Sequence, residues 1–353
     1  MQTQSKFRLL VVRLGAMGDI LHALPAVTAL RLAHPSWIID WVVEPRWRAL
    51  FSAEDSLGRV VSQPLVNALH FASTKQWRNK ALSAQTLREI RTLRRNLRAA
   101  NYDAVLDLQG AIRSAIVCRL AGCRRVIGEA TPREGIARVL FTEQVATHGA
   151  HVIEQDMELA SAVAGDELTP AIPLLPVDPA AEAWAEELLA SGEKQQAVLI
   201  NPGAGWGAKR WPVERYAAVA KGLAARGFRV LMNTGPGEQP LADAILAKEV
   251  SATPVTCSLG QLIALSRRVA LVIAGDTGPL HLACALTRPV VGIYGPTDPS
   301  RNGPFGTRFK VLRSPESRRD HTRHQAPEAG LLTIQPDEVL QAAEELLGSE
   351  VAQ

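Results

Sequence analysis

The sequence lacks the features by which several large classes of protein are recognised. It contains four cysteines, and none of them lies at the spacing of a metal-ligand motif. They stand among apolar residues and are expected to be small buried side chains in a reducing compartment; they are Cys118, Cys123, Cys257 and Cys284. An Asp-x-Asp pair is also missing, so the sequence predicts neither a bound metal nor another cofactor.

Long apolar runs and several catalytic motifs are missing as well. No apolar run approaches the ~20 residues of a membrane-spanning helix. Residues Arg8 to Arg13 form a short strand between charges rather than the apolar region of a signal peptide. We therefore expect a cytoplasmic protein that can visit a membrane surface. A G-x-S-x-G elbow and a Walker loop are absent, which argues against a hydrolase nucleophile and an NTPase.

Acidic residues are almost missing from the segment between residues 75 and 98. It has eight basic residues against one acidic residue, Glu89. The basic residues are Lys75, Arg78, Lys80, Arg88, Arg91, Arg94, Arg95 and Arg98. Such a run favours an anionic partner. The alternative is a solvated helix face, because apolar residues recur at helical spacing from Leu87 to Leu97, and the sequence leaves both interpretations open.

Strand-like and helix-like runs alternate almost throughout the chain. Several strand-like runs are continuously apolar, which is typical of parallel strands covered on both faces. The strand candidates are Leu9–Val12, Ile38–Val43, Ala104–Asp107, Val126–Ile127, Val198–Ile200, Arg229–Met232, Val269–Ala274 and Val290–Tyr294. Helices are expected at Ile20–Ala33, Ala84–Ala100, Arg113–Leu120, Val213–Arg226, Leu280–Leu286 and about Asp337 to Leu347. Repeated strand–helix units predict a doubly wound α/β architecture.

The segment from Thr169 to Pro179 divides this pattern. It carries four prolines and no helical period, as in a linker. The strand–helix pattern restarts at Val198, so the 353 residues suit two Rossmann-like domains. Because ligands of such sheets lie at the carboxyl ends of the strands, we expect the active site in a cleft between the two domains.

The strongest candidate site follows the strand-like run Val269–Ala274. Asp276 to His281 leads into a helix that Pro279 is suited to begin. The N–H groups and the positive dipole end at such a helix start form an anion site. Here the site has a carboxylate, a hydroxyl and an imidazole beside it. This combination indicates a phosphate attached to a group that needs hydrogen bonds, such as a sugar.

A second strand-end loop lies in the first half of the chain. Gly15 and Gly18 allow a tight turn with close backbone approach, but the G-x-G-x-x-G fingerprint of dinucleotide-binding loops is absent from it. Asp19 follows at the start of the next helix. It is either an ordinary first-turn carboxylate or a general base for a hydroxyl nucleophile.

Two further loops follow strands in the second half. One contains three glycines, of which Gly203 is the first, and then Lys209. Its amides and its lysine suit a diphosphate, although a solvated loop lysine is the simpler interpretation. The other loop ends at Glu238, which either accepts hydrogen bonds from ribose hydroxyls or merely starts the next helix.

At these residues the chain resembles glycosyltransferase family 9, the ADP-heptose:lipopolysaccharide heptosyltransferases, and within that family the heptosyltransferase I type. The pairing of a G-x-x-G-D loop in the first half with GDTG-x-x-H in the second half is specific. The matching segments run nearly from end to end: RLGAMGDILHALPAV, IDWVVEP, NYDAVLDLQGAIRSA, KRWP, GDTGPLHLACAL and IYGPTDP.

The resemblance implies a GT-B fold, in which two Rossmann-like domains face each other across a cleft. Residues 1–172 would form the N-terminal acceptor-binding domain, and residues 173–335 the C-terminal domain that binds the nucleotide sugar. Residues 336–353 would form a C-terminal helix that packs back on the N-terminal domain. The donor would be ADP-heptose, no nucleic acid would be bound, and the protein would be a monomer.

The family's site residues carry over onto matching positions of this sequence. The catalytic residues would be Asp19, as the base, and Lys209, as a diphosphate contact. Other donor-binding residues would be Gly203, Glu238, Asp276, Thr277, Gly278 and His281; of these, Thr277 and Gly278 would offer N–H groups to phosphate and Glu238 would hold the ribose. The acceptor-binding residues would be Arg13, Gly18, Lys75, Arg78, Lys80 and Arg133.

Two departures from the family pattern and one unmatched segment bear on the acceptor. Arg13 stands where the type I enzymes often have lysine, and the two cations differ in geometry. Ala16 replaces a hydroxyl-bearing residue that is common in the loop. The segment from Ser314 to Gly330, which is rich in arginine and histidine, lies outside the segments that carry the resemblance.

The resemblance implies an inverting, metal-independent reaction. Asp19 would deprotonate a Kdo hydroxyl of the lipopolysaccharide inner core, which attacks the anomeric carbon of ADP-heptose. Kdo-lipid A would be the acceptor, at the inner face of the cytoplasmic membrane, with which the protein would associate transiently. The alternatives are a family 9 transferase that uses another acceptor, either a heptose of the inner core or a protein, and a non-catalytic sugar-nucleotide binding protein.

Overall fold

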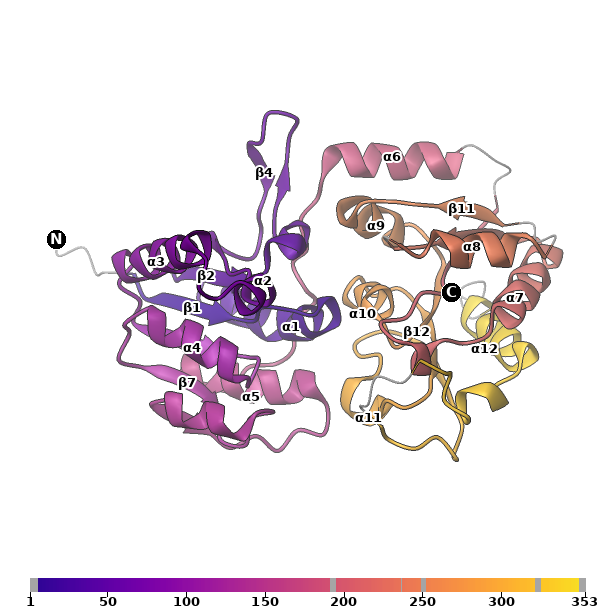
Figure 1. Ribbon diagram of the computed structural model, residues 1–353. Coiled ribbons are helices and arrows are strands. Elements are labelled where there is room, and N and C mark those ends of the chain that lie inside the picture. Colours follow the sequence, from indigo (N-terminus) through magenta and orange to yellow (C-terminus); the bar gives the residue numbers. More distant parts are fainter. Residues whose placement is uncertain (1–5, 191–194, 236, 249–251, 321–324, 349–353) are drawn as a thin grey trace. The chain divides into compact units, whose positions relative to one another are not determined.

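The chain forms two compact units, Met1–Pro176 (unit 1) and Val177–Gln353 (unit 2). The structure is a computed structural model and describes residues 6–190, 195–235, 237–248, 252–320 and 325–348 (Figure 1). The boundary between the units lies inside the proline-rich segment that the sequence predicts as a linker, four residues beyond residue 172. No helix or strand is present from residue 165 to residue 178, all of which are described.

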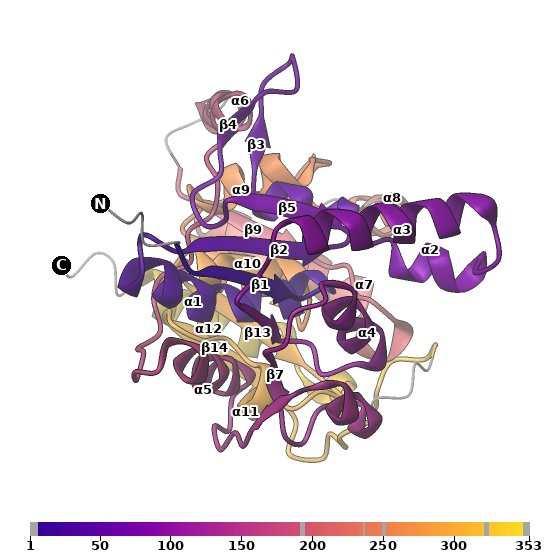
Figure 2. The same cartoon turned by 90° about the vertical axis from the view of Figure 1, so that its left-hand side faces the viewer.

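Unit 1 is built on a parallel sheet of six strands in the order β5-β2-β1-β6-β7-β8. The strands are β1 (Arg8–Val12), β2 (Ile38–Val43), β5 (Ala68–Phe71), β6 (Ala104–Asp107), β7 (Val126–Glu129) and β8 (Glu143–Val145). A hairpin of β3 (Ala53–Glu54) and β4 (Val60–Ser62) projects from this unit (Figures 1 and 2).

Helices cover both faces of this sheet. The helices are α1 (Met17–Ala33), α2 (Thr74–Asn79), α3 (Ala84–Ala99), α4 (Ile112–Leu120) and α5 (Val152–Ala164), with 3-10 helices η1 (Pro45–Leu50) and η2 (Gly135–Leu140). α1 packs against α5. Side chains of α3, α4 and η2 share one apolar cluster with the sheet, so these three elements cover the same face.

Unit 2 repeats the architecture with a parallel sheet in the order β11-β10-β9-β12-β13-β14. The strands are β9 (Ala197–Asn201), β10 (Arg229–Asn233), β11 (Thr253–Val255), β12 (Leu271–Gly275), β13 (Val290–Tyr294) and β14 (Phe309–Arg313). The helices are α6 (Pro179–Ala190), α7 (Val213–Ala225), α8 (Gln239–Leu246), α9 (Leu259–Ser266), α10 (Gly278–Ala285), α11 (Pro299–Asn302) and α12 (Pro336–Gly348), with 3-10 helices η3 (Gly207–Lys209) and η4 (Leu331–Thr333).

The C-terminal helix α12 is part of the core of unit 2, and the expectation that it also packs back on the N-terminal domain stays a prediction. α12 packs against α7 and against β12, β13 and β14, all within unit 2. Its apolar stripe, which includes Val339, Ala343 and Leu347, is buried in the core of that unit. Because full burial of a Val or Leu side chain stabilises by ~1.5–3 kcal/mol, this stripe is enough to hold the helix on the sheet that precedes it in the chain. Residues 349–353 of the expected helical segment lie outside the described residues.

The predicted doubly wound architecture is confirmed in both units. All eight strands expected from the sequence are present as the four central strands of each sheet. The four edge strands, β5, β8, β11 and β14, were not expected. Within the part of the chain that the structure describes, no helix is both long and apolar enough to cross a membrane.

Candidate functional site

The candidate residues of unit 2 lie at one edge of its sheet. β10, β9 and β12 are parallel neighbours whose ends are in register, since Met232 pairs with Ile200 and Asn201 pairs with Ala274. Each of these strands is followed directly by a loop that carries candidates. The fold therefore brings together three loops that are up to about 70 residues apart in the sequence, as expected for ligand loops at the carboxyl ends of parallel strands.

The centre of this edge is a cluster of Lys209, Asp276 and His281. The Lys209 ammonium forms an ion pair with Asp276 Oδ2 and donates to the Asp276 carbonyl (3.3 Å). On the other side, the His281 Nε2 lies 3.1 Å from Asp276 Oδ1. Lys209 and Asp276 each expose 10% of the side chain and His281 exposes 5%. The sequence suggested these as separate contacts, whereas the structure joins them into one hydrogen-bonded unit.

This cluster keeps the Asp276 carboxylate ionised. Burial alone would raise the pKa of Asp276, but the hydrogen bond with His281 and the charge of Lys209 outweigh it and hold the pKa well below its usual range. The result is a buried carboxylate that faces a cation with one oxygen and an imidazole with the other. A second anion brought to Lys209 would therefore share or replace the contact with Asp276.

Thr277 and Gly278 begin α10 directly after Asp276. Thr277 is the N-cap residue, and its hydroxyl donates to the Gly275 carbonyl (3.2 Å) instead of capping the helix. Pro279 stands in the first turn of the helix, as predicted. The helix start is thus left without a side-chain cap beside the Lys209 cluster, which suits an external anion.

Gly203 and Glu238 are in contact across the loops after β9 and β10. A Cβ atom on Gly203 would lie 2.2 Å from Glu238 Oε2, so this position has no room for a side chain while Glu238 stays in place. The Glu238 carboxylate accepts a hydrogen bond from the Gly235 N–H (2.8 Å). Glu238 also precedes α8, so its two predicted roles are compatible. Pro236 of the same loop lies outside the described residues.

Two supports of the Lys209 loop were not predicted as site residues. The Lys209 ammonium lies 4.2 Å from the centre of the Trp206 ring, in a cation–π arrangement. The Glu328 N–H donates to the Ala208 carbonyl (3.1 Å), and the Gln325 carbonyl leaves no space for a side chain at Gly207. The described part of the arginine- and histidine-rich segment therefore packs on this loop; its residues 321–324 lie outside the described residues. A tryptophan three residues before the lysine was the one signal available in the sequence.

The candidate residues around Asp19 form a second cluster, in unit 1. Asp19 Oδ2 accepts a hydrogen bond from the Ala16 N–H (3.1 Å). The Arg13 guanidinium donates to the Asp19 carbonyl (3.1 Å) and lies 3.7 Å from Asp19 Oδ1. Gly18 stands between them in the first turn of α1. Asp19 exposes 32% of its side chain, while Arg13 exposes only 8%, so the carboxylate is fixed but accessible.

The loop that carries Asp19 is anchored from neighbouring strands. The Leu14 N–H donates to Gln109 Oε1 (2.8 Å), and the Trp41 indole donates to the Arg13 carbonyl (3.0 Å). Gln109 follows β6 and Trp41 belongs to β2, the two neighbours of β1. These buried hydrogen bonds hold the backbone on both sides of the sheet strand, so the position of the carboxylate is determined by tertiary contacts.

The other predicted acceptor residues also lie beyond the carboxyl ends of the unit 1 strands. In the contacts described they do not touch one another. Lys75, Arg78 and Lys80 are exposed on or directly after α2, which follows β5. Arg133 is exposed in the loop after β7, beside the turn at Gly110. Arg13 differs from them, because its guanidinium is buried against Asp19.

Comparison with known proteins decides the family. A family model described as "Glycosyltransferase family 9 (heptosyltransferase)" matches residues 90–331. The chain belongs to glycosyltransferase family 9. Lipopolysaccharide heptosyltransferase 1 of Escherichia coli strain K12 is 31% identical over 317 residues, which cover 87% of this chain and 94% of that protein.

Solved heptosyltransferase structures agree with this family. The E. coli heptosyltransferase WaaC with ADP is 26% identical and superimposes with a TM-score of 0.78 over 96% of this chain and 100% of that chain. The same enzyme with ADP-2-deoxy-2-fluoro heptose gives a TM-score of 0.76 over 96% and 99%. The two Rossmann-like units are thus those of a GT-B glycosyltransferase, and the family 9 chain is an enzyme of heptose transfer in lipopolysaccharide synthesis.

Proposed function

We propose that this family 9 enzyme transfers heptose from ADP-heptose to a Kdo hydroxyl of the lipopolysaccharide inner core, with inversion at the anomeric carbon and without a metal. The observation that carries the proposal is the Lys209–Asp276–His281 cluster beside the uncapped start of α10. It supplies a cation, an amide-lined anion site and a sugar-binding carboxylate at one sheet edge. The likeness to lipopolysaccharide heptosyltransferase 1 supports heptose transfer in lipopolysaccharide synthesis, and the likeness to a heptosyltransferase solved with ADP-2-deoxy-2-fluoro heptose supports ADP-heptose as the donor.

In the proposed reaction, unit 2 stabilises the leaving diphosphate. Negative charge grows on ADP as the glycosidic bond breaks, and Lys209 and the N–H groups of Thr277 and Gly278 offset that charge. Removing one preorganised contact of this kind costs ~3 kcal/mol, on the order of a hundredfold in rate. Lys209 takes the part that a metal ion plays in other transferases, while Glu238 accepts hydrogen bonds from the ribose and Gly203 lets that carboxylate approach.

Asp19 is the proposed general base. Its carboxylate takes the proton of the acceptor hydroxyl as that oxygen attacks the anomeric carbon from the face opposite to ADP. Arg13 is a positioning residue in this scheme, because it is buried against the Asp19 backbone and carboxylate. Lys75, Arg78, Lys80 and Arg133 are the proposed contacts for phosphate groups of Kdo-lipid A. The enzyme would act as a monomer at the inner face of the cytoplasmic membrane.

The experiment compares Asp19→Asn with Glu154→Gln. Glu154 is a matched control, because its carboxylate also accepts a backbone N–H at the start of a helix, that of His151 (2.9 Å). We expect Asp19→Asn to lose at least about a hundredfold in ADP release while ADP-heptose still binds, and Glu154→Gln to keep turnover. Equal turnover in the two variants would show that Asp19 is only a helix cap.

Separate assays test the identity of the acceptor and the independence from a metal. ADP release is assayed with Kdo-lipid A, with a heptose-bearing inner-core acceptor and with neither. Preference for the heptose-bearing acceptor would replace the Kdo assignment with that of another family 9 transferase. The proposed reaction requires that turnover persists in EDTA. It also requires that the product has the inverted anomeric configuration.

A further inference from the structure

The proposed reaction leaves one surface of unit 1 without a role. This outer face consists of the solvent-exposed side chains of α3, α4 and η2. The three elements cover the same face of the sheet, since Leu97, Ala115 and Ala137 belong to one apolar cluster. α4 packs against both α3 and η2, and α3 and α4 lie side by side in both views (Figures 1 and 2). Their outward sides therefore form one continuous surface.

Aliphatic side chains stand exposed on this outer face. Val139 exposes 71% of its surface and Ile136 exposes 69%, both on η2. Ile116 (50%) and Ile112 (38%) stand one turn apart on α4. Single exposed aliphatic residues are ordinary, but four on two packed elements indicate a surface that is covered in use.

The charged residues that lie among these aliphatic residues on α4 and η2 are all positive. Arg113 and Arg119 are the charged residues of α4 and Arg138 is the charged residue of η2, so neither element carries an acid. α3 adds five arginines and Glu89, whose carboxylate already accepts hydrogen bonds from Trp77 and Gln85. The outer face thus alternates aliphatic and guanidinium groups.

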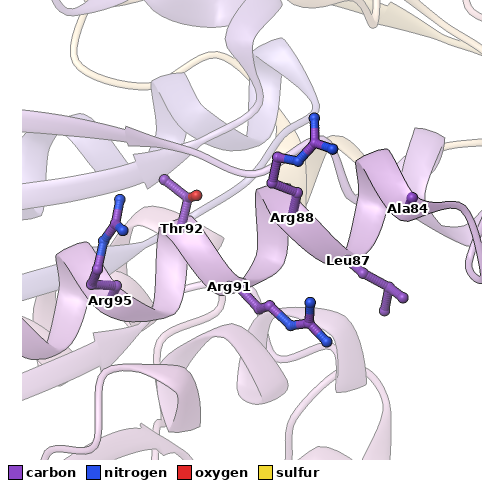
Figure 3. Close-up of a pocket in the computed structure, with 6 residues that line it drawn as sticks. All are labelled: Ala84, Leu87, Arg88, Arg91, Thr92 and Arg95. Atoms are coloured by element: carbon purple, nitrogen blue, oxygen red, sulfur yellow. The ribbon is translucent and has the colours of Figure 1, made fainter.

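Figure 3 shows the arginine-rich part of this face. A groove of about 460 Å³ runs along the exposed side of α3. Arg88, Arg91, Arg95 and Leu87 line it; in this view the side chains of Arg88 and Arg95 point to one side of α3, and those of Arg91 and Leu87 point to the other. Successive guanidinium groups along a helix offer separate anion contacts rather than one closed pocket, which matches a layer of headgroups better than a single small ligand.

We propose that the outer face docks unit 1 on an anionic lipid bilayer. Exposed aliphatic groups among arginines are the features of an element that lies in a lipid interface, where the aliphatic groups enter the acyl boundary and the cations meet anionic headgroups. The excess of arginine over acid selects an anionic surface by charge complementarity. The inference builds on the membrane location proposed above, but it does not depend on which sugar accepts the heptose.

Docking would serve the proposed acceptor edge of the same unit. α4 begins at Ile112, after the short loop that follows the carboxyl end of β6, and the Ile112 N–H donates to Glu134 Oε2 (2.8 Å) in the loop after β7. Arg133, a proposed acceptor contact, is the neighbour of Glu134. The outer face therefore lies next to the carboxyl ends of the unit 1 strands, where a membrane-held acceptor would bind.

Vesicle binding tests this proposal with no acceptor present. The full-length protein is sedimented with vesicles of phosphatidylcholine alone or of phosphatidylcholine mixed with phosphatidylglycerol. We expect binding to the anionic vesicles only. Ile136→Ser/Val139→Ser should weaken that binding by about tenfold or more, and Arg113→Gln/Arg138→Gln should reduce the dependence on phosphatidylglycerol and on salt. Ile116→Ser gives an independent single variant on α4 if the double variant on η2 fails to fold.

The matched control lies on the hairpin of the same unit. Leu57 and Val60 expose 74% and 53% of their surface, and the hairpin precedes β5, at the opposite edge of the sheet from η2 and β8. Leu57→Ser/Val60→Ser should bind anionic vesicles like the wild type. The proposal is wrong if the wild type does not bind anionic vesicles, or if control and outer-face variants lose binding equally. Transfer to a water-soluble acceptor without acyl chains should be unchanged in the outer-face variants, which separates a docking defect from failure of the proposed reaction.

Discussion

The ion pair between Lys209 and Asp276 allows the structural and catalytic roles of Lys209 to be separated. Both side chains are nine-tenths buried, and Asp276 also accepts the His281 contact. Lys209→Met leaves the Asp276 carboxylate buried with the imidazole as its main partner. Breaking a buried pair by removing one partner costs ~3–5 kcal/mol, and the remaining contact with His281 favours the lower end of this range.

This loss should appear as a lower melting temperature. In a domain of 150–250 residues, 1 kcal/mol corresponds to ~2–4 °C, so we expect Lys209→Met to melt roughly 6–12 °C below the wild type. In Lys209→Met/Asp276→Leu both charges are gone, and replacement of a buried ion pair by apolar residues of similar volume is often neutral or stabilising. The double variant should therefore melt near the wild type.

Activity should behave differently from stability. If Lys209 offsets charge on the leaving ADP, both the single and the double variant should release ADP at least about a hundredfold more slowly than the wild type. Melting is followed by circular dichroism and turnover by ADP release. Lys310→Met serves as the control, because Lys310 pairs with Glu345 at the surface of unit 2, where both side chains are 46% exposed; it should change neither quantity appreciably.

Two results would refute this reasoning. A Lys209→Met variant as stable as Lys310→Met would show that the buried pair does not contribute to the fold as described. A double variant that regains activity together with stability would show that Lys209 acts on the reaction only by holding Asp276.

Two further predictions follow from the same sheet edge. The folded-state pKa of Asp276 lies below its ordinary value of 3.8, so its ionised form stabilises the fold above about pH 4. This stabilisation is lost as the pH falls and the carboxylate becomes protonated. The difference in melting temperature between the wild type and Asp276→Asn should therefore be constant from about pH 5 to 7 and become smaller below about pH 4. Gly203→Ala should raise the KM for ADP-heptose, because a Cβ there displaces the Glu238 carboxylate, whereas Gly205→Ala, which has nothing within 4 Å of its Cβ, should leave it unchanged; equal KM values would refute the contact.

The central strands were predictable because they are buried on both faces. β1 and β12, for example, are almost wholly apolar and almost fully buried. A strand that is buried on both faces needs apolar residues at nearly every position, and this continuous apolar run is visible in the sequence. The edge strands β5 and β14 are half-exposed and carry mixed residues, and no local pattern distinguishes them from loops. They become strands because a neighbouring strand offers hydrogen bonds, which is a tertiary condition.

The candidate site divides in the same way. Glycine spacing, the proline at the start of α10 and the polar residues after each strand were visible in the sequence, because strand-end loops and helix starts are local features. The Lys209–Asp276 pair joins residues from the loops that follow two different strands, the Trp206 ring packs against an ammonium, and Arg13 turns inward to Asp19. None of these contacts follows from spacing along the chain.

The sequence by itself thus determined the two parallel α/β units, the loops at their carboxyl edges and the family to which they belong. These features depend on local burial patterns and on turn residues, which each segment carries within itself. Only the tertiary structure decided that α12 completes unit 2, that Lys209 and His281 hold one buried carboxylate, and that α3, α4 and η2 share an outer face. The local sequence shows that an apolar stripe must be buried or that a buried charge must be paired. Which distant segment supplies the contact is determined by the tertiary packing.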